Sequence, residues 1–133
     1  MLRQLTRKTR AGFTLVEIMI VVAIIALLAA IAVPGFLRAR KRSQASKILN
    51  DLRLISSAMD QYAIETGKKT NDPIGIADWT RYLKQSTNLE ATGNDLFGQP
   101  YGAQVVDSLP HVVQSSYDAL SDVTDDAFWS PYH

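Results

Sequence analysis

The sequence predicts an α+β fold in which a long N-terminal α-helix, with a transmembrane half and an amphipathic half, packs on a small antiparallel β-sheet head. Three observations support this prediction. From Ile18 to Val33 no residue has a polar side chain. After this run, apolar residues recur at helical spacing as far as Tyr62. Residues 67–133 have a mixed composition, with turn residues between short β-prone segments.

The apolar segment is long enough to cross a bilayer. Between positions 13 and 33, polar side chains occur only at Thr14 and Glu17. A predominantly apolar stretch of about 18 residues or more is sufficient for a transmembrane helix. Basic residues lie both before the segment and directly after it, at 38–42. The distribution of positive charge therefore leaves the orientation of the span open.

This segment has three interpretations. A secretory signal peptide would explain the basic start and the small residues at 30–32, but its apolar core would be long and would contain Glu17. A plain membrane anchor gives no reason for a carboxylate at that position, where burial in lipid is costly. Cleavage just before Phe13 would create an α-amino group four residues from Glu17. The carboxylate would then serve the amine of a neighbouring copy and set the axial register between subunits.

The residues around this boundary resemble the class III signal of type IV pilins and type II secretion pseudopilins. The resemblance rests on the string Lys8-Thr9-Arg10-Ala11-Gly12-Phe13-Thr14-Leu15-Val16-Glu17. It implies that a prepilin peptidase cuts after Gly12 and methylates the new N-terminus at Phe13. It also implies that Glu17 is the assembly carboxylate and that Pro34 kinks the helix.

A second helical pattern follows the apolar segment. Its apolar positions alternate three- and four-residue spacings, which is typical of a helix that buries one stripe: Ala45, Ile48, Leu52, Ile55, Met59 and Tyr62. Gly67 then provides a stop signal. We therefore divide the chain into a cleaved basic leader at 1–12, a transmembrane and assembly helix at 13–34, an amphipathic helix at 35–66 and a small globular head at 67–133.

Within the head, the sequence predicts a short helix, a β-hairpin and an acidic C-terminal loop. Asp78 is the expected N-cap of the short helix. Residues 88–94 are expected to form a loop. The β-prone segments 101–106 and 111–115 are expected to pair as the antiparallel hairpin.

The string from Asp95 to Tyr101 distinguishes between the two branches of the family. It resembles the Asp-Pro-Trp-Gly-x-Pro-Tyr loop of major type II pseudopilins, with Leu96 in place of the proline and Phe97 in place of the tryptophan. The chain also has no cysteine, whereas many pilins close a C-terminal disulfide loop. Both features favour a pseudopilin over a pilin.

Four carboxylates near the C-terminus are candidate calcium ligands: Asp118, Asp122, Asp125 and Asp126. Calcium takes six to eight oxygen ligands, often from clustered carboxylates and loop carbonyls. Major pseudopilins carry a calcium loop near this point, although the glycine-rich spacing of that loop is missing here. The alternative is a solvated acidic turn, with no cofactor bound.

The composition argues against two other classes of function. The chain has no cysteine, no His-Glu-x-x-His string and no glycine-rich phosphate loop, so it offers no catalytic site. Four of the 14 basic residues precede Phe13, so the remainder of the chain is net acidic. A net acidic head gives no electrostatic basis for binding nucleic acid.

The predicted function is structural: copies assemble through their N-terminal helices into an envelope-spanning filament, with the head in the periplasm or outside the cell. The resemblance implies a type II secretion pseudopilin of the bacterial inner membrane. Its partners would be a prepilin peptidase and methyltransferase, an assembly ATPase, an inner-membrane platform protein, and minor pseudopilins or pilins. The alternatives are a type IV pilus subunit for adhesion, motility or DNA uptake, and a single-span anchored binding domain that never polymerises.

Overall fold

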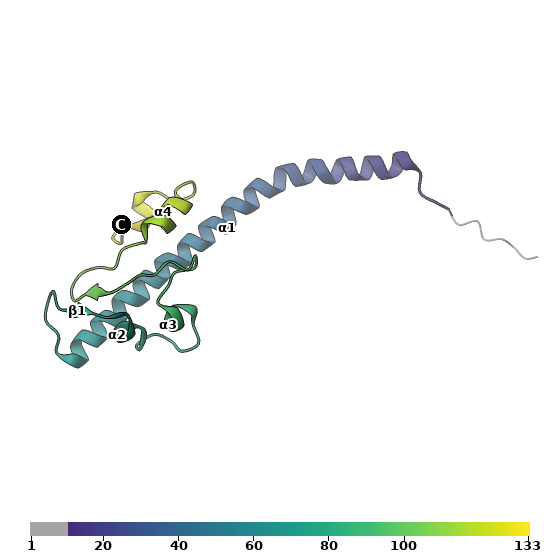
Figure 1. Ribbon diagram of the computed structural model, residues 1–133. Coiled ribbons are helices and arrows are strands. Elements are labelled where there is room, and N and C mark those ends of the chain that lie inside the picture. Colours follow the sequence, from purple (N-terminus) through teal and green to yellow (C-terminus); the bar gives the residue numbers. More distant parts are fainter. Residues whose placement is uncertain (1–10) are drawn as a thin grey trace, which may run out of the picture. The chain divides into compact units, whose positions relative to one another are not determined.

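The computed structural model describes residues 11–133, so most of the predicted basic leader lies outside the described residues. A single long helix, α1 (Leu15–Thr66), confirms the main prediction (Figure 1). It begins two residues after the predicted start and ends where predicted, because Gly67 adopts a positive φ of 66°. The chain divides into two compact units, one ending at Leu37 and the other spanning Arg38–His133.

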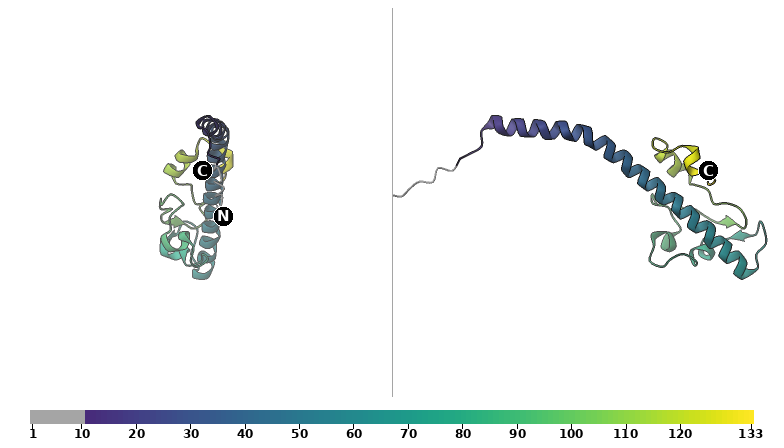
Figure 2. Two further views of the ribbon diagram at one scale, coloured as in Figure 1. Left: turned by 90° about the vertical axis from the view of Figure 1, so that its right-hand side faces the viewer. Right: turned by 180° about the vertical axis from the view of Figure 1, so that it is seen from behind.

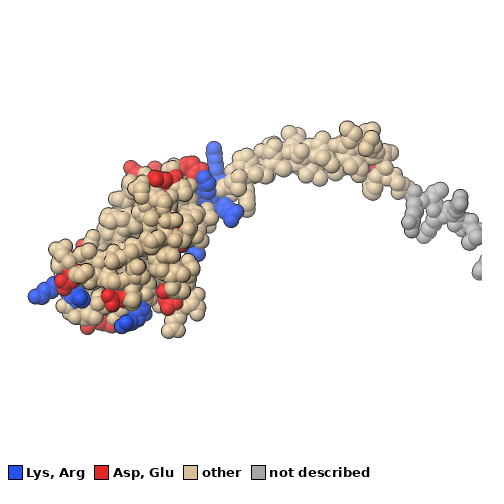
Figure 3. Space-filling view, in the orientation of Figure 1, with Lys and Arg blue, Asp and Glu red and all other residues tan. Residues whose placement is uncertain are grey.

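The first unit contains the apolar part of α1. Its described residues are all solvent-exposed, with no packed face. Figure 3 shows this stretch as a nearly uniform uncharged surface, with acidic atoms only near its N-terminal end. Pro34 lies inside the helix near the end of this stretch. A helix that is apolar on every side requires an apolar environment, which a bilayer or a bundle of similar helices provides.

In the second unit, the other half of α1 buries one stripe against the head. The predicted positions Ala45, Ile48, Leu52 and Ile55 are fully buried, and Met59 is almost so. Tyr62 is half-buried and packs edge-to-face on Tyr82. Each large aliphatic side chain buried in this way stabilises the fold by about 1.5–3 kcal/mol. The apolar stripe that the sequence predicts is therefore the surface through which α1 packs against the head.

Short elements connected by turns cover this stripe, and Figures 1 and 2 show them lying along the same part of α1. In chain order they are β1 (Pro73–Ile74), α2 (Ile76–Thr80), α3 (Asn88–Thr92), β2 (Gln104–Val105), α4 (Gln114–Leu120) and α5 (Asp126–Trp129). With so few residues in each, their stability comes from the shared core rather than from their own backbone hydrogen bonds.

The small antiparallel sheet is present, but its pairing differs from the prediction. β1 pairs with β2 through Pro73 opposite Val105 and Ile74 opposite Gln104. The predicted hairpin between residues 101–106 and 111–115 is wrong, because the chain from Gln114 onward forms α4. The Val112 amide instead donates to the Tyr132 carbonyl at 2.8 Å. Local β-propensity at the two adjacent valines was overridden by tertiary packing.

Three other predictions about the head are corrected. Asp78 is the third residue of α2 rather than its N-cap, and its carboxylate accepts from the Gly75 amide at 3.0 Å. The expected loop at 88–94 contains α3, which Thr87 caps by accepting from the Glu90 amide. The expected acidic C-terminal loop is largely helical and is occupied by α4, a turn and α5.

The head core closes with residues near the C-terminus. Trp129 of α5 is fully buried, and Tyr132 is nearly so. The indole nitrogen of Trp129 donates to the Thr124 hydroxyl at 3.1 Å, which satisfies its polar group inside the core. The core therefore joins the first long helix to the last turns of the chain.

Candidate assembly segment and head surface

The motif at the start of α1 forms a reciprocal helix cap. The Glu17 amide donates to the Thr14 hydroxyl at 3.2 Å, and the Thr14 amide donates to the Glu17 carboxylate at 3.4 Å. This arrangement is a capping box, in which side chains satisfy two of the backbone amides left free at a helix start. The Thr-x-x-Glu spacing was the signal for it, and the sequence reasoning did not use Thr14.

The cap gives Glu17 a definite position in the isolated subunit. Its carboxylate lies in the first turn of α1, where a negative charge also complements the partial positive charge of the helix end. Gly12 and Phe13 immediately precede this turn, and both are exposed. The two sides of the predicted cleavage bond are therefore accessible. Cleavage, methylation and pairing of Glu17 with a second copy remain predictions.

The apolar part of α1 meets the length and composition of a membrane span. Its most apolar window has a mean hydropathy of 3.0. The basic residues at 38–42 follow it on the same helix. One of them, Lys41, pairs with Asp122 in the turn after α4 at 2.8 Å. This ion pair lowers the pKa of Asp122 and attaches the turn between α4 and α5 to α1.

The string that resembles the pseudopilin loop is held by Asp95. This carboxylate is 1% exposed and accepts from the amides of Phe97 and Gln99 at 2.8 and 2.9 Å. Its second oxygen accepts from the hydroxyl of Ser116 on α4. Asp95 therefore forms the turn and joins it to another element. This role explains why a carboxylate opens the string, and the sequence alone did not show it.

Next to this turn, a second buried carboxylate has no such partners. Asp51 on α1 is 8% exposed. Burial raises its pKa, while Lys47 lowers it and Asp95 raises it further. The nearby Tyr101 hydroxyl is buried without a hydrogen-bond partner among the described residues, and burial together with Asp51 and Asp95 raises its pKa as well. This cluster could not be predicted from the sequence, because it depends on contacts between distant segments.

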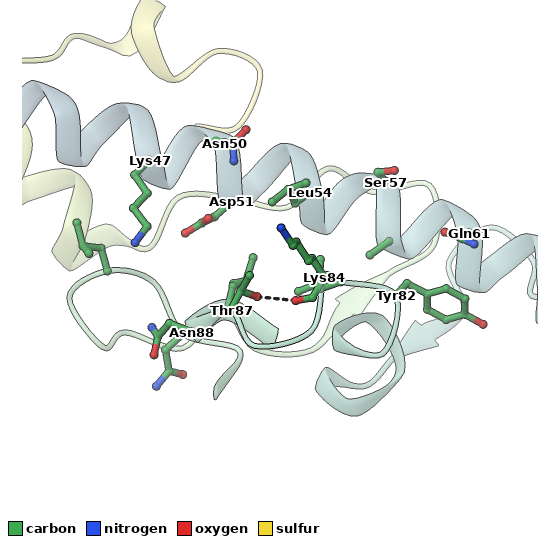
Figure 4. Close-up of a pocket in the computed structure, with 15 residues that line it drawn as sticks. Lys47, Asn50, Asp51, Leu54, Ser57, Gln61, Tyr82, Lys84, Thr87 and Asn88 are labelled. Atoms are coloured by element: carbon green, nitrogen blue, oxygen red, sulfur yellow. Dashed lines mark hydrogen bonds between the residues drawn. The ribbon is translucent and has the colours of Figure 1, made fainter. Parts of the chain in front are cut away.

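Asp51 lines a groove of about 440 Å³ between α1 and residues 82–96 (Figure 4). The lining alternates leucines with polar side chains. Lys47 and Lys84 are exposed along its edge. The Thr87 hydroxyl donates to the Lys84 carbonyl at 3.0 Å and fixes the turn on the opposite side. The groove is therefore a preformed surface that combines apolar contacts with charges of both signs.

The four candidate calcium ligands have separate partners. Asp118 accepts from Gln114, and Asp122 is bound to Lys41. Asp125 caps α5 through the Phe128 amide, and Asp126 accepts from the Tyr117 hydroxyl. Among residues 11–133, no three His, Cys, Asp or Glu side chains come together as a group able to hold a metal ion. Calcium binding by these residues thus remains an untested hypothesis.

The N-terminal segment and the head together define a class of proteins: membrane-anchored subunits in which a long apolar helix continues into a small α+β head. The family described as the prokaryotic N-terminal methylation motif matches residues 7–33. This match and the relatives described below support a pilin and pseudopilin family for the chain. These relatives are structural proteins, not enzymes. No solved structure shows significant similarity to this chain.

Similarity to individual relatives extends over different shares of the chain. The type II secretion system core protein G of Klebsiella michiganensis is 26% identical, over 90% of this chain and 92% of that protein. The core protein G of Aeromonas hydrophila is 23% identical, over 71% and 73%. The type IV major pilin protein PilA of Myxococcus xanthus is 41% identical, but over 50% of this chain and 31% of that protein.

Proposed function

We propose that this chain is a structural subunit of a type II secretion pseudopilus, a filament of many copies that supports protein export. The observation that carries the proposal is the extent of the similarity to the two core proteins G, which covers 90% and 71% of this chain. The higher identity to the pilin PilA covers 50%. The Asp95 turn supports the same choice, because the carboxylate that opens the pseudopilin-like string is retained and forms the turn.

The proposed location is the bacterial inner membrane, with the head in the periplasm. A prepilin peptidase and methyltransferase would cut between Gly12 and Phe13 and methylate the new amine. Assembly would then use a platform protein, a cytoplasmic ATPase, and minor pseudopilins. The accessible cleavage bond and the apolar helix behind it support this sequence of events.

Glu17 carries the proposed assembly step. A carboxylate inside a bilayer or a helical bundle is costly unless it has a cationic partner. Cleavage supplies one, because the new α-amino group at Phe13 is positively charged. Pairing between the amine of one copy and Glu17 of the next would replace the local bond to Thr14 and determine the stagger between helices.

The test is made in the native bacterium with a Gly12 variant and a Glu17 variant. Replacing Gly12 with valine should retain the leader, so mass spectrometry should find the uncut chain in the membrane. Glu17→Ala should be cut normally and remain in the membrane, yet it should not enter filaments. Wild-type levels of filament incorporation for Glu17→Ala would contradict the assembly role. A Gly12→Val chain that still begins at Phe13 would contradict the cleavage site.

A type IV pilus subunit is the second candidate, and the 41% identity to PilA favours it. Deletion of the gene distinguishes the two functions. The pseudopilus proposal expects exported proteins to accumulate in the periplasm while surface pili persist. Loss of surface pili with normal export would instead identify a pilin.

A further inference from the structure

The groove between α1 and residues 82–96 is lined by one acidic side chain, Asp51, and by two lysines. Asp51 is nearly buried, and Figure 4 shows its carboxylate pointing from α1 into the groove. Within the described part of the chain it makes no hydrogen bond and no ion pair. The residue as a whole is buried, but its carboxylate oxygens keep contact with the solvent in the groove. The carboxylate is therefore accessible to a group from outside the subunit.

The surroundings of Asp51 define what would complete the site. Leu54 and Leu96, both partly exposed, provide an apolar floor beside the carboxylate. Lys47 and Lys84 provide ammonium groups along the edge. Asp95 also lies close enough to affect the pKa of Asp51. A fitting partner would therefore present a cation for Asp51, an anion for a lysine, and a surface able to pack on leucine.

The outer face of α1 offers that combination. Arg53 and Asp60 are exposed, and among residues 11–133 neither forms an ion pair. They are seven residues apart, so they lie on one stripe of the helix, separated by about 10 Å. This stripe points away from the core stripe that contains Leu52. Each copy therefore has a charged groove and, on a different face, a stripe of complementary charges.

We propose that the groove of one copy receives the Arg53–Asp60 stripe of a second copy, with Arg53 bound to Asp51 and Asp60 bound to Lys84. This inference rests on the proposed function, since it requires filament assembly. The two surfaces are different parts of the chain, so the contact is heterologous. Heterologous contacts that do not close into a ring produce open helical filaments.

The first experiment compares two substitutions in the full-length chain. Asp51→Asn removes the buried charge and nearly preserves the shape, and Asp107→Asn is the control at an exposed acidic residue outside the groove. We expect Asp51→Asn to reduce filament incorporation on the order of tenfold. Its thermal unfolding midpoint in detergent micelles should equal or exceed that of the wild type. Asp107→Asn should assemble normally.

The second experiment uses the fact that the chain has no cysteine. Two copies with different epitope tags are co-expressed, one carrying Lys84→Cys and the other Asp60→Cys. Oxidation of the membranes should produce a disulfide-linked dimer that contains both tags. A control pair of Lys84→Cys and Thr70→Cys should give no mixed dimer, because Thr70 lies on a different part of the head.

The outcomes separate this inference from the proposed function. If the wild type forms no filament, the proposed function fails and the contact fails with it. If the wild type assembles, Asp51→Asn assembles equally well and no mixed dimer forms, this inference alone is overturned. Normal assembly of Asp51→Asn with lost export would also overturn it, because the groove would then serve an exported protein.

Discussion

The Tyr101 side chain gains stability from the packing of its ring and loses stability from the desolvation of its hydroxyl. Its ring belongs to the head core, while its hydroxyl is the one buried side-chain oxygen without a hydrogen-bond partner among residues 11–133. A buried hydroxyl without a partner costs about 1–3 kcal/mol on protein mutational scales. Burial, and after it the neighbouring carboxylates Asp51 and Asp95, raise the pKa of this tyrosine, so it stays neutral.

We therefore predict that Tyr101→Phe leaves the free energy of unfolding unchanged or raises it by about 1 kcal/mol. Denaturant unfolding of the full-length chain in micelles measures this change. Tyr117→Phe is the matched control, because the Tyr117 hydroxyl donates to Asp126 and its loss should lower stability. A clear loss of stability in Tyr101→Phe would show that the hydroxyl has a partner in solution.

Asp51 should make the stability of the fold depend on pH. Burial, the largest effect, raises its pKa above the ordinary value of 3.8, while Lys47 opposes this and Asp95 adds to it. Between 3.8 and the raised pKa, the folded state binds more protons than the unfolded state. Stability contributed by this group therefore falls as the pH rises through that window.

Substituting Asp51 with Asn removes this dependence. The unfolding midpoint of Asp51→Asn relative to wild type should therefore increase from below pH 3.8 towards neutral pH and then remain constant. Parallel thermal melts of the two proteins across this range provide the measurement. A difference between them that does not change with pH would contradict the raised pKa.

At the scale of elements, Gly93 shows what a helix end requires when another helix packs on it. It ends α3 with a φ of 66°. A Cβ at this position would lie 2.7 Å from a methyl carbon of Ile76 on α2. Gly67 ends α1 with the same φ but has open space around it. A side chain at Gly67 would therefore strain only the backbone, whereas one at Gly93 would strain the backbone and also collide with Ile76.

We predict that Gly67→Ala destabilises the head by about 1 kcal/mol, the cost of a left-handed conformation for a residue with a Cβ. Gly93→Ala should cost about 2–4 kcal/mol, since the overpacking against Ile76 adds to that strain. Unfolding midpoints of the two variants test the difference. Equal losses would mean that α2 moves aside without cost.

The elements also show where the sequence was informative. The long helix, its buried stripe and its stop at Gly67 follow local periodicity, and all were predictable. The pairing of β1 with β2 joins residues about thirty positions apart, so no local pattern could specify it. α3 was missed although Thr87 and Glu90 have capping-box spacing, a signal that was available. The predicted hairpin relied on β-propensity alone, which tertiary contacts readily override.

At the scale of the whole molecule, the acidic C-terminal region is attached to the rest of the head by protein contacts. Asp122 pairs with Lys41, and Asp125 caps α5. We therefore predict that EDTA leaves the thermal unfolding midpoint of the full-length chain unchanged. The comparison is made with and without added calcium. A midpoint that rises with calcium and falls with EDTA would show that these carboxylates bind the ion.

The functional surfaces differ in how far the sequence predicts them. Gly12, Phe13 and Glu17 lie within six consecutive residues, so the candidate assembly segment could be predicted as a string. The groove brings Asp51 together with Lys84, and only the folded head places them on one surface. The sequence identified the helix that carries Asp51, but not the surroundings that leave its charge unpartnered.

The position of Trp129 and Tyr132 in the core determines when the head can fold during synthesis. Every other buried element leaves the ribosome before them, and α1 is made first. The core of the head is therefore complete only when the last turns have been made and the Tyr132 carbonyl can accept from the Val112 amide. Until then, the elements made earlier can cover the α1 stripe only in part.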